Sequence, residues 1–214
     1  MRILAIDGAL GGFSVALDDG SAVVADASRS PDALERGLGR IEDLLARAGL
    51  RLRDLDRIAV GTGPGSFTGL RIAVSYAKAL AYGSAIPLVG VSSYDALEPE
   101  SPPLPLITVV RGRRDVVCAR RRDERRQEYA CGPPADVLDR LLTGPPGPLA
   151  AAGDTEDVLA QIAERGWNVR ALPPRDEIPA VAIAALARVR RPLASPHALA
   201  PDYGEAPAVR PSVL

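Results

Sequence analysis

Cysteine, histidine and long apolar runs are scarce in this chain, and each shortage excludes a class of protein. We expect Cys118 and Cys131, the two cysteines, to form no metal site and no disulfide framework, which favours a reducing cytoplasm. His197 is the single histidine, so a metal held by several histidines is excluded. No apolar run is long enough to cross a membrane, and Met1–Asp7 is too short and too soon acidic for a signal peptide.

The length and the net charge of the chain limit the number of domains and the kinds of partner it can have. The 214 residues can hold one large domain or two small ones, and a content of 47% apolar and 25% charged residues is ordinary for a globular protein. The formal net charge of -1 argues against independent, high-affinity RNA binding.

A glycine-rich stretch from Gly61 to Arg71, here called the signature loop, organises the chain. It reads GTGPGSFTGLR, follows the apolar run Ile58–Val60 and precedes apolar residues at helical spacing over 70–82, so it predicts a strand, a tight turn and a helix with Thr68 as N-cap. A Walker A loop is excluded because Leu70, not lysine, follows Gly69. A Rossmann fingerprint fits poorly because Ser66 stands where its third glycine belongs.

Together with AKALA at 77–81 and IPLVGVSS at 86–93, the signature loop resembles the bacterial TsaB (YeaZ) family, most densely over residues 2–97. That family is the non-catalytic subunit of the machinery that makes threonylcarbamoyladenosine in tRNA. The resemblance implies an α/β chain with the actin-like ATPase (ASKHA) fold in two related lobes. We expect a first lobe over 1–98 and a second, degenerate duplicate over 99–214.

The local patterns predict elements that fit this fold. In the first half, the sequence predicts a hairpin turn at Asp18-Asp19-Gly20 and a helix start at Ser30-Pro31-Asp32. It also predicts a short helix through Leu97, capped by Ser92, and then a linker to Pro105. The strands predicted are 2–7, 13–17, 22–27, 58–60, 86–91, 105–110, 115–119, 127–131, 149–152 and 168–172. The helices predicted are 33–48, 70–82, 135–142, 154–165 and 176–189.

A nucleotide loop is one candidate site. In ATPases of this fold, an aspartate ending the first strand holds the metal's water shell, and the next turn holds phosphate. Relatives usually continue Asp-Thr-Ser, whereas this chain has Asp7-Gly8-Ala9, and losing both hydroxyls favours a scaffold over an ATPase. Asp7 alone is equally a turn-former. The candidate residues are Asp7, Gly63, Gly65, Ser66 and Gly69; whether they touch nucleotide at a subunit interface stays open.

A partner surface is the second candidate. The resemblance implies that the helices after Ser30 and after Gly69 form the family's association face, and Gly37 and Gly39 would suit a closely packed helix. A monomer core explains the same stripe, and the isolated chain could be a monomer or a homodimer. The candidate residues are Leu38, Ile41, Leu45, Leu70, Ala73, Ala77 and Ala81.

Catalytic groups are not evident. The catalytic paralogue, TsaD, carries two metal-binding histidines four residues apart on a helix, where this chain has Ser93 and Leu97. The resemblance therefore implies no cofactor of its own, with ATP and metal on TsaD-like and TsaE-like partners and tRNA reached only through the complex. A small ATP-dependent kinase or acyltransferase of the same fold is the alternative.

An arginine-rich hairpin could contact a phosphate backbone, which would make the chain a stand-alone RNA-binding module. We favour a solvated face instead, offset by Asp115, Asp123, Glu124 and Glu128, because no aromatic residue interleaves the arginines. The arginines are Arg111, Arg113, Arg114, Arg120, Arg121, Arg122, Arg125 and Arg126.

Overall fold

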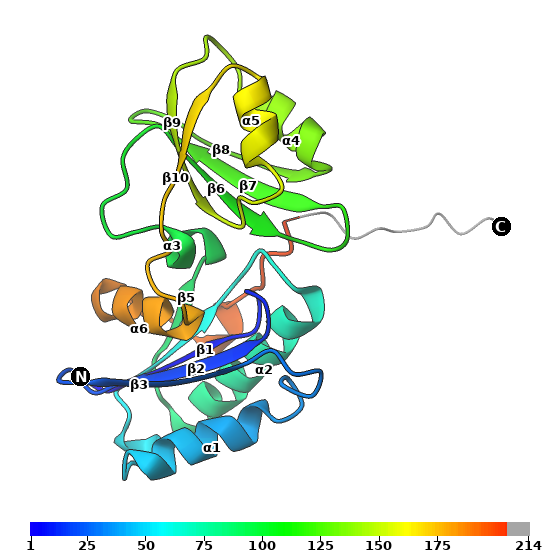
Figure 1. Ribbon diagram of the computed structural model, residues 1–214. Helices are drawn as coiled ribbons and strands as arrows, with labels where there is room; N and C mark the ends of the chain where they lie inside the picture. The colour runs from blue at the N-terminus through cyan, green and yellow to red at the C-terminus, as the bar shows by residue number, and fades with distance from the viewer. Residues whose placement is uncertain (205–214) are drawn as a thin grey trace.

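The computed structural model describes residues 1–204 as two lobes, one above the other in Figure 1, each built on a five-stranded sheet. The first sheet has the order β3-β2-β1-β4-β5. Its strands are β1 (Ile3–Asp7), β2 (Phe13–Asp18), β3 (Val23–Ser28), β4 (Arg57–Gly61) and β5 (Leu88–Val91). The second sheet has the order β10-β9-β6-β7-β8. Its strands are β6 (Leu106–Arg111), β7 (Val117–Arg122), β8 (Gln127–Gly132), β9 (Pro148–Gly153) and β10 (Asn168–Ala171).

The two sheets repeat one topology. In each, the first three strands form an antiparallel meander, and the next two add in parallel beside the first strand. The internal duplication expected from the sequence is therefore present. β7 begins two residues later than predicted because Asp115, at a φ of 60°, belongs to the preceding turn.

β1 is central to the first sheet and buried on both faces, which explains its continuous apolar run. Successive side chains point to opposite faces. Leu4 and Ile6 join one core with α1 (Gly37–Arg47) and α2 (Phe67–Ser84), whereas Ile3 and Ala5 join another with α6 (Pro179–Val189). Helices α1 and α2 thus cover one face of this sheet and α6 the other (Figure 1).

The placement of α6 corrects the predicted division of the chain. Helix α3 (Ser93–Leu97) ends the first run of elements, and residues 98–105 form no helix or strand. The segment assigned to a second lobe, however, returns to the first after residue 172. Leu193 donates its N–H to Leu88, and Leu199 lies in the core with α1 and α2. The second lobe proper keeps α4 (Pro134–Leu141) and α5 (Leu159–Glu164) on one face of its sheet.

Several predicted helix starts are wrong: α5 begins at Leu159 rather than at 154, and α6 at Pro179 rather than at 176. Residues 31–36 form turns, and α1 begins only at Gly37, because the Ser30 hydroxyl donates to Asp32 (2.6 Å) instead of capping a helix. The N-cap of α2 is Ser66, not Thr68: its Oγ accepts the Gly69 N–H at 3.3 Å. Over the described residues, no helix has the length and apolar character needed to cross a bilayer.

The expectation of no disulfide is also wrong. Cys118 and Cys131 lie directly opposite each other in the β7–β8 register, with their Cα atoms 4.1 Å apart, and their sulfur atoms are bonded. The cause is the symmetric hairpin around residues 123–126, which brings the two cysteines to the same rung of the ladder.

Candidate functional site

The signature loop packs directly on the turn between β1 and β2. A methyl group at Gly8 or at Gly69 would overlap the backbone of the other residue, and one at Gly65 would overlap the carbonyl of Ala9. Ser66 donates its N–H to that same carbonyl (2.9 Å). Gly63 and Gly65 have φ values of 96° and 150°, which only glycine adopts readily. Backbone therefore fills the space between the two loops.

Asp7 ends β1 beneath this contact and is 2% exposed. One carboxylate oxygen accepts the Leu10 N–H at 2.9 Å, and the other has no hydrogen-bond partner among residues 1–204. Burial raises the pKa of Asp7 to about 6, against the lowering effect of the backbone N–H groups of the turn. Asp7 is thus buried and shapes the turn after β1. Two of the nucleotide candidates, Gly65 and Ser66, line the cleft described next.

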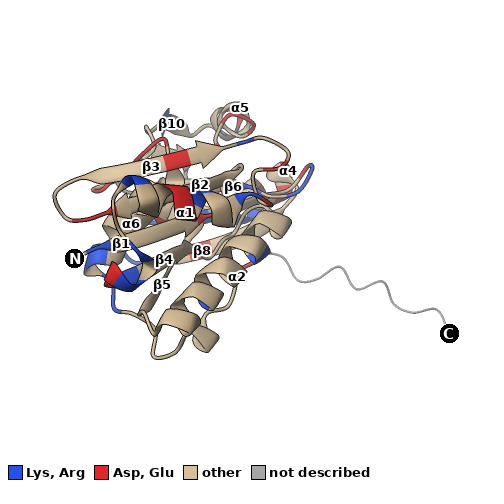
Figure 2. Cartoon of the chain, turned by 90° about the horizontal axis from the view of Figure 1, so that it is seen from below, with Lys and Arg blue, Asp and Glu red and all other residues tan. Residues whose placement is uncertain are grey.

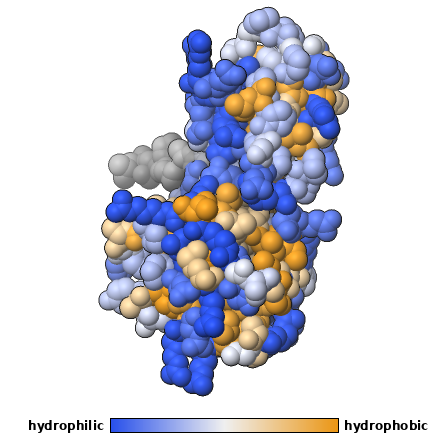
Figure 3. Space-filling model, turned by 90° about the vertical axis from the view of Figure 1, so that its left-hand side faces the viewer, coloured by the Kyte–Doolittle hydropathy of each residue, from blue (hydrophilic) through white to orange (hydrophobic). Residues whose placement is uncertain are grey.

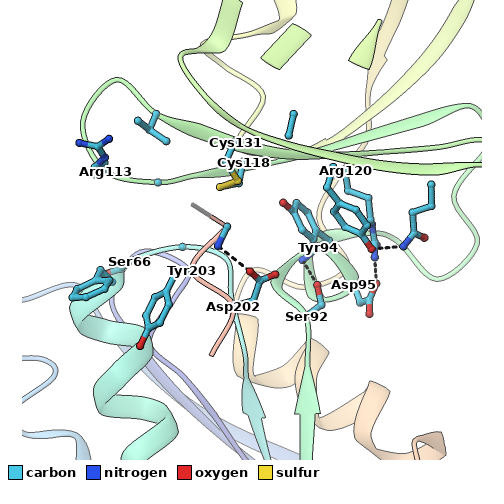
Figure 4. A pocket seen from close by; sticks show the side chains of 18 of the residues that line it. Ser66, Ser92, Tyr94, Asp95, Arg113, Cys118, Arg120, Cys131, Asp202 and Tyr203 are labelled. Carbon is cyan, nitrogen blue, oxygen red and sulfur yellow. Dashed lines mark hydrogen bonds and ion pairs between the residues drawn. A yellow bond between two sulfur atoms is a disulfide. The ribbon is translucent and has the colours of Figure 1, made fainter. Parts of the chain in front are cut away.

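A cleft of about 1670 Å³ separates the lobes. Its first-lobe wall is the start of α2, α3 and the chain at Asp202–Gly204, and its second-lobe wall is β7, β8 and α4. Figure 4 shows the Cys118–Cys131 disulfide on the strand side, opposite Asp202 and Tyr203. On the face seen in Figure 3, hydrophilic side chains collect at the waist between the lobes.

Ion pairs close the back of the cleft. Arg120 on β7 is 5% exposed and binds Asp95 (2.6 Å) and Glu98 (2.7 Å) from the first lobe. Arg122 also binds Glu98 (2.6 Å), and Arg190 binds Asp95 (2.6 Å). Burial alone would raise the pKa of Asp95, but hydrogen bonds and charge from Arg190 and Arg120 hold it below its ordinary value.

Aromatic rings line the same cleft in two pairs. Phe67 and Tyr203 lie 5.0 Å apart on the first lobe, and Tyr94 faces Tyr129 of β8 at 5.7 Å. The Arg71 guanidinium lies 4.1 Å from the centre of the Phe67 ring. This grouping could not be predicted from the hairpin's own residues, because three of the four rings come from distant segments. Tyr129 could have been placed beside the cleft, because it lies in the predicted strand 127–131 of the hairpin that forms the second-lobe wall.

The arginine hairpin is not the simple solvated face that was predicted. Arg111 pairs with Asp157 (2.9 Å), and Arg121 lies 5.0 Å from the Trp167 ring while donating to the Leu141 carbonyl at 2.5 Å. With Arg120 and Arg122, these side chains pair with partners outside the hairpin. Of the predicted acids, Asp123 accepts N–H groups from Arg125 and Arg126 in the turn.

The predicted partner surface is largely the chain's own core. Leu38 alone of those residues is exposed (43%). The other six are buried beneath the first sheet, so they are unavailable to a partner; these are Ile41, Leu45, Leu70, Ala73, Ala77 and Ala81. The close approach expected at Gly37 is to Phe13 and Tyr76, whereas Gly39 has open space around it.

Two lobes with the same sheet topology and a cleft between them define the class: an α/β protein of the actin-like ATPase (ASKHA) fold. The family model described as "TsaD: tRNA N6-adenosine threonylcarbamoyltransferase" matches residues 31–171. The structure of YeaZ from Pseudomonas aeruginosa superposes with a TM-score of 0.68 at 25% identity, covering 95% of this chain and 100% of that one.

Curated relatives agree. "tRNA threonylcarbamoyladenosine biosynthesis protein TsaB" of Escherichia coli is 44% identical over 94 residues, which are 44% of this chain and 41% of that protein. TsaB of Bacillus subtilis is 36% identical over 99 residues, 45% of this chain and 43% of the relative. The chain belongs to the TsaB (YeaZ) family, within the wider family that TsaD names. The matching segment spans less than half the length of these relatives.

Proposed function

We propose that this chain is a non-catalytic subunit of the machinery that forms N6-threonylcarbamoyladenosine at position 37 of tRNA, and that it binds and activates a TsaD-like catalytic subunit. Family membership supports the pathway. The observation that carries the non-catalytic role is the backbone packing of Gly8 on Gly69. In an ATPase of this fold, the turn after the first strand holds phosphate, and here that turn is closed against the signature loop.

The docking face would be the outer side of α1 and α2. Besides Leu38, it presents Ser75, Ala79 and Gly83, small exposed residues at four-residue spacing that would let a partner helix approach closely. Figure 2 shows α2 as almost entirely uncharged, since Arg71 and Lys78 are its only charged residues. A small uncharged helix face suits docking to another helix, by a TsaD-like partner or by a second copy in a homodimer.

The partners would supply the rest of the chemistry. ATP and metal would bind to TsaD-like and TsaE-like subunits, with tRNA modified in the assembled complex. No group of three or more metal-binding side chains gathers anywhere in residues 1–204.

A small ATP-dependent kinase or acyltransferase remains the second candidate because of one observation. Asp7 stands at the end of β1 with a carboxylate oxygen that no group in the described chain satisfies. A metal-bound water could donate a hydrogen bond to such an oxygen.

Reconstitution tests the proposal. Purified TsaD-like and TsaE-like proteins from the same genome are mixed with unmodified tRNA, ATP and a threonylcarbamoyl donor, with and without this chain. The modified nucleoside is then measured by mass spectrometry of digested tRNA. We expect modification only when the chain is present, and no ATP turnover by the chain alone. Undiminished modification without the chain would refute the proposal, and ATP turnover lost in Asp7→Asn would favour the kinase.

A further inference from the structure

Two aromatic rings of the cleft remain about half exposed, although Tyr203 and Arg71 contact Phe67 and Tyr94 contacts Tyr129. Phe67 is 53% exposed and Tyr129 49%, although each already has an aromatic neighbour. They come from opposite walls, Phe67 from α2 and Tyr129 from β8. A flat, conjugated ligand group could therefore stack on either wall.

Positive charge surrounds these rings. Arg71, Arg113 and Arg140 line the cleft from both lobes and are exposed. The acids at the back of the cleft, Asp95 and Glu98, are already matched by three guanidinium groups. Asp202 also lines the cleft, with one carboxylate oxygen accepting the Gly204 N–H at 2.8 Å. Arg71 and Arg140 thus add positive charge at the mouth of the cleft, one from each lobe.

The volume and the rigidity of the cleft limit further which class of ligand it can bind. Sites for single small molecules span roughly 300 to 1,000 Å³, whereas this cleft has about 1670 Å³. The buried Arg120 of the second lobe lines the cleft and lies 5.2 Å from the Tyr94 ring of the first-lobe wall, so its ion pairs hold Tyr94 opposite Tyr129 of the other wall. The cleft therefore suits an extended, anionic ligand with several flat groups.

We propose that the cleft between the lobes binds an unpaired stretch of tRNA, with bases stacking on Phe67 and Tyr129 and phosphates contacting Arg71 and Arg140. Aromatic faces alternating with arginines are how proteins hold single-stranded nucleic acid. The inference deepens the proposed function, because it gives this subunit its own contact with the substrate. The net charge of -1 argues against tight RNA binding by the surface as a whole, but the local charge of Arg71 and Arg140 can act on a strand inside the cleft.

The test measures binding by fluorescence anisotropy. The probe is a fluorescein-labelled single-stranded oligouridylate, with a fully paired RNA duplex of the same length as comparison. Purified chain and the reconstituted complex are both titrated over a range of salt concentrations. We expect the single strand to bind more tightly than the duplex, with an affinity that falls as salt rises.

Four variants test which side chains contribute to RNA binding. Phe67→Ala and Tyr129→Ala should each raise the Kd by about 5-fold or more through lost stacking. Tyr82→Ala is the matched control, an exposed tyrosine of α2 outside the cleft, and should leave the Kd unchanged. Arg140→Gln should reduce the slope of log K against log salt by about 0.7, the value for one phosphate contact on a single strand.

Equal effects of Phe67→Ala and Tyr82→Ala would overturn the proposal, as would equal binding of duplex and single strand. So would displacement of the RNA by poly-glutamate at equal charge, because the cleft would then be a general anion site. The proposed function fails separately: if the complex still needs this chain for modification while no variant alters RNA binding, the activating role stands and the RNA contact does not.

Discussion

Arg120 and Asp95 join the two lobes through an ion pair of 2.6 Å, although 25 residues separate them in sequence. Arg120 belongs to β7 of the second sheet, and Asp95 to α3 of the first lobe. Glu98 extends the contact, accepting from Arg120 and from the Thr108 hydroxyl at 2.5 Å. The relative position of the lobes therefore depends on Arg120 and Glu98, which are almost fully buried, and on the partly exposed Asp95.

Removing Arg120 should destabilise the protein strongly. Arg120→Met leaves Glu98 and Asp95 with less compensation in a buried site, so we expect the free energy of unfolding to fall by about 3 to 5 kcal/mol in urea titrations. Glu98→Gln added to that variant should recover part of the loss. The exposed pair of Arg36 with Asp32 is the control, and Arg36→Ala should cost no more than about 0.5 kcal/mol. Similar losses in Arg120→Met and Arg36→Ala would contradict the prediction.

Stability should fall between pH 4 and pH 6 because of Asp7. Its pKa is raised by burial from 3.8 to about 6, so the folded protein binds a proton more tightly than the unfolded chain does. The contribution, on the order of 3 kcal/mol, is fully present below pH 3.8 and lost as the pH rises through 6. Melting temperatures across this range are compared for wild type and Asp7→Asn. The variant should lack this component, and an identical pH profile would exclude the assignment.

Two alanines of α2 should respond oppositely to charge. Ala77 is fully buried, so Ala77→Glu places an unpaired charge in the core and should cost more than about 4 kcal/mol, unfolding the chain. Ala79, two residues on, is exposed, and Ala79→Glu should melt like wild type. Gel filtration with the TsaD-like partner, and of the chain alone, should show that Ala79→Glu weakens association. Intact binding by a folded Ala79→Glu variant would refute the docking face.

Two glycines of the same helix make a second contrast. Gly69→Ala forces apart the backbones of the signature loop and of Gly8, so we expect a loss of several kcal/mol or no soluble protein. Gly83 has open space around it, and Gly83→Ala should stabilise the protein by about 0.5 to 1 kcal/mol through helix propensity. Thermal melts of both decide this, and tolerance of Gly69→Ala would show that the packing is loose.

Local patterns predicted most of the elements correctly. The signature loop reads as strand, turn and helix because its glycines and apolar spacing act within a few residues. The hairpin at Asp18-Asp19-Gly20 forms for the same reason, with Gly20 at a φ of 95°. Ser92 caps α3, as expected from its position before the helix, by accepting the Tyr94 N–H. Each of these outcomes depends on neighbours in sequence.

Partners far apart in sequence could not be predicted in this way. The small stripe at Ala73, Ala77 and Ala81 looked the same whether it faced a core or a partner, and only the sheet above it decides that. The arginine hairpin likewise gave no hint of Trp167 or Asp157. The cysteine pair could have been predicted, because counting both strands outward from the turn at 123–126 sets Cys118 opposite Cys131.

The return of α6 to the first sheet has a consequence for synthesis on the ribosome. The first lobe's strands emerge first, but Ile3 and Ala5 on their upper face stay uncovered until α6 follows. The second lobe is continuous in sequence, from β6 to β10, so it can fold while the first lobe is still incomplete. A nascent chain stalled before Pro179 would expose an apolar sheet face and invite aggregation. The lobe that begins to fold first is the one that is finished last.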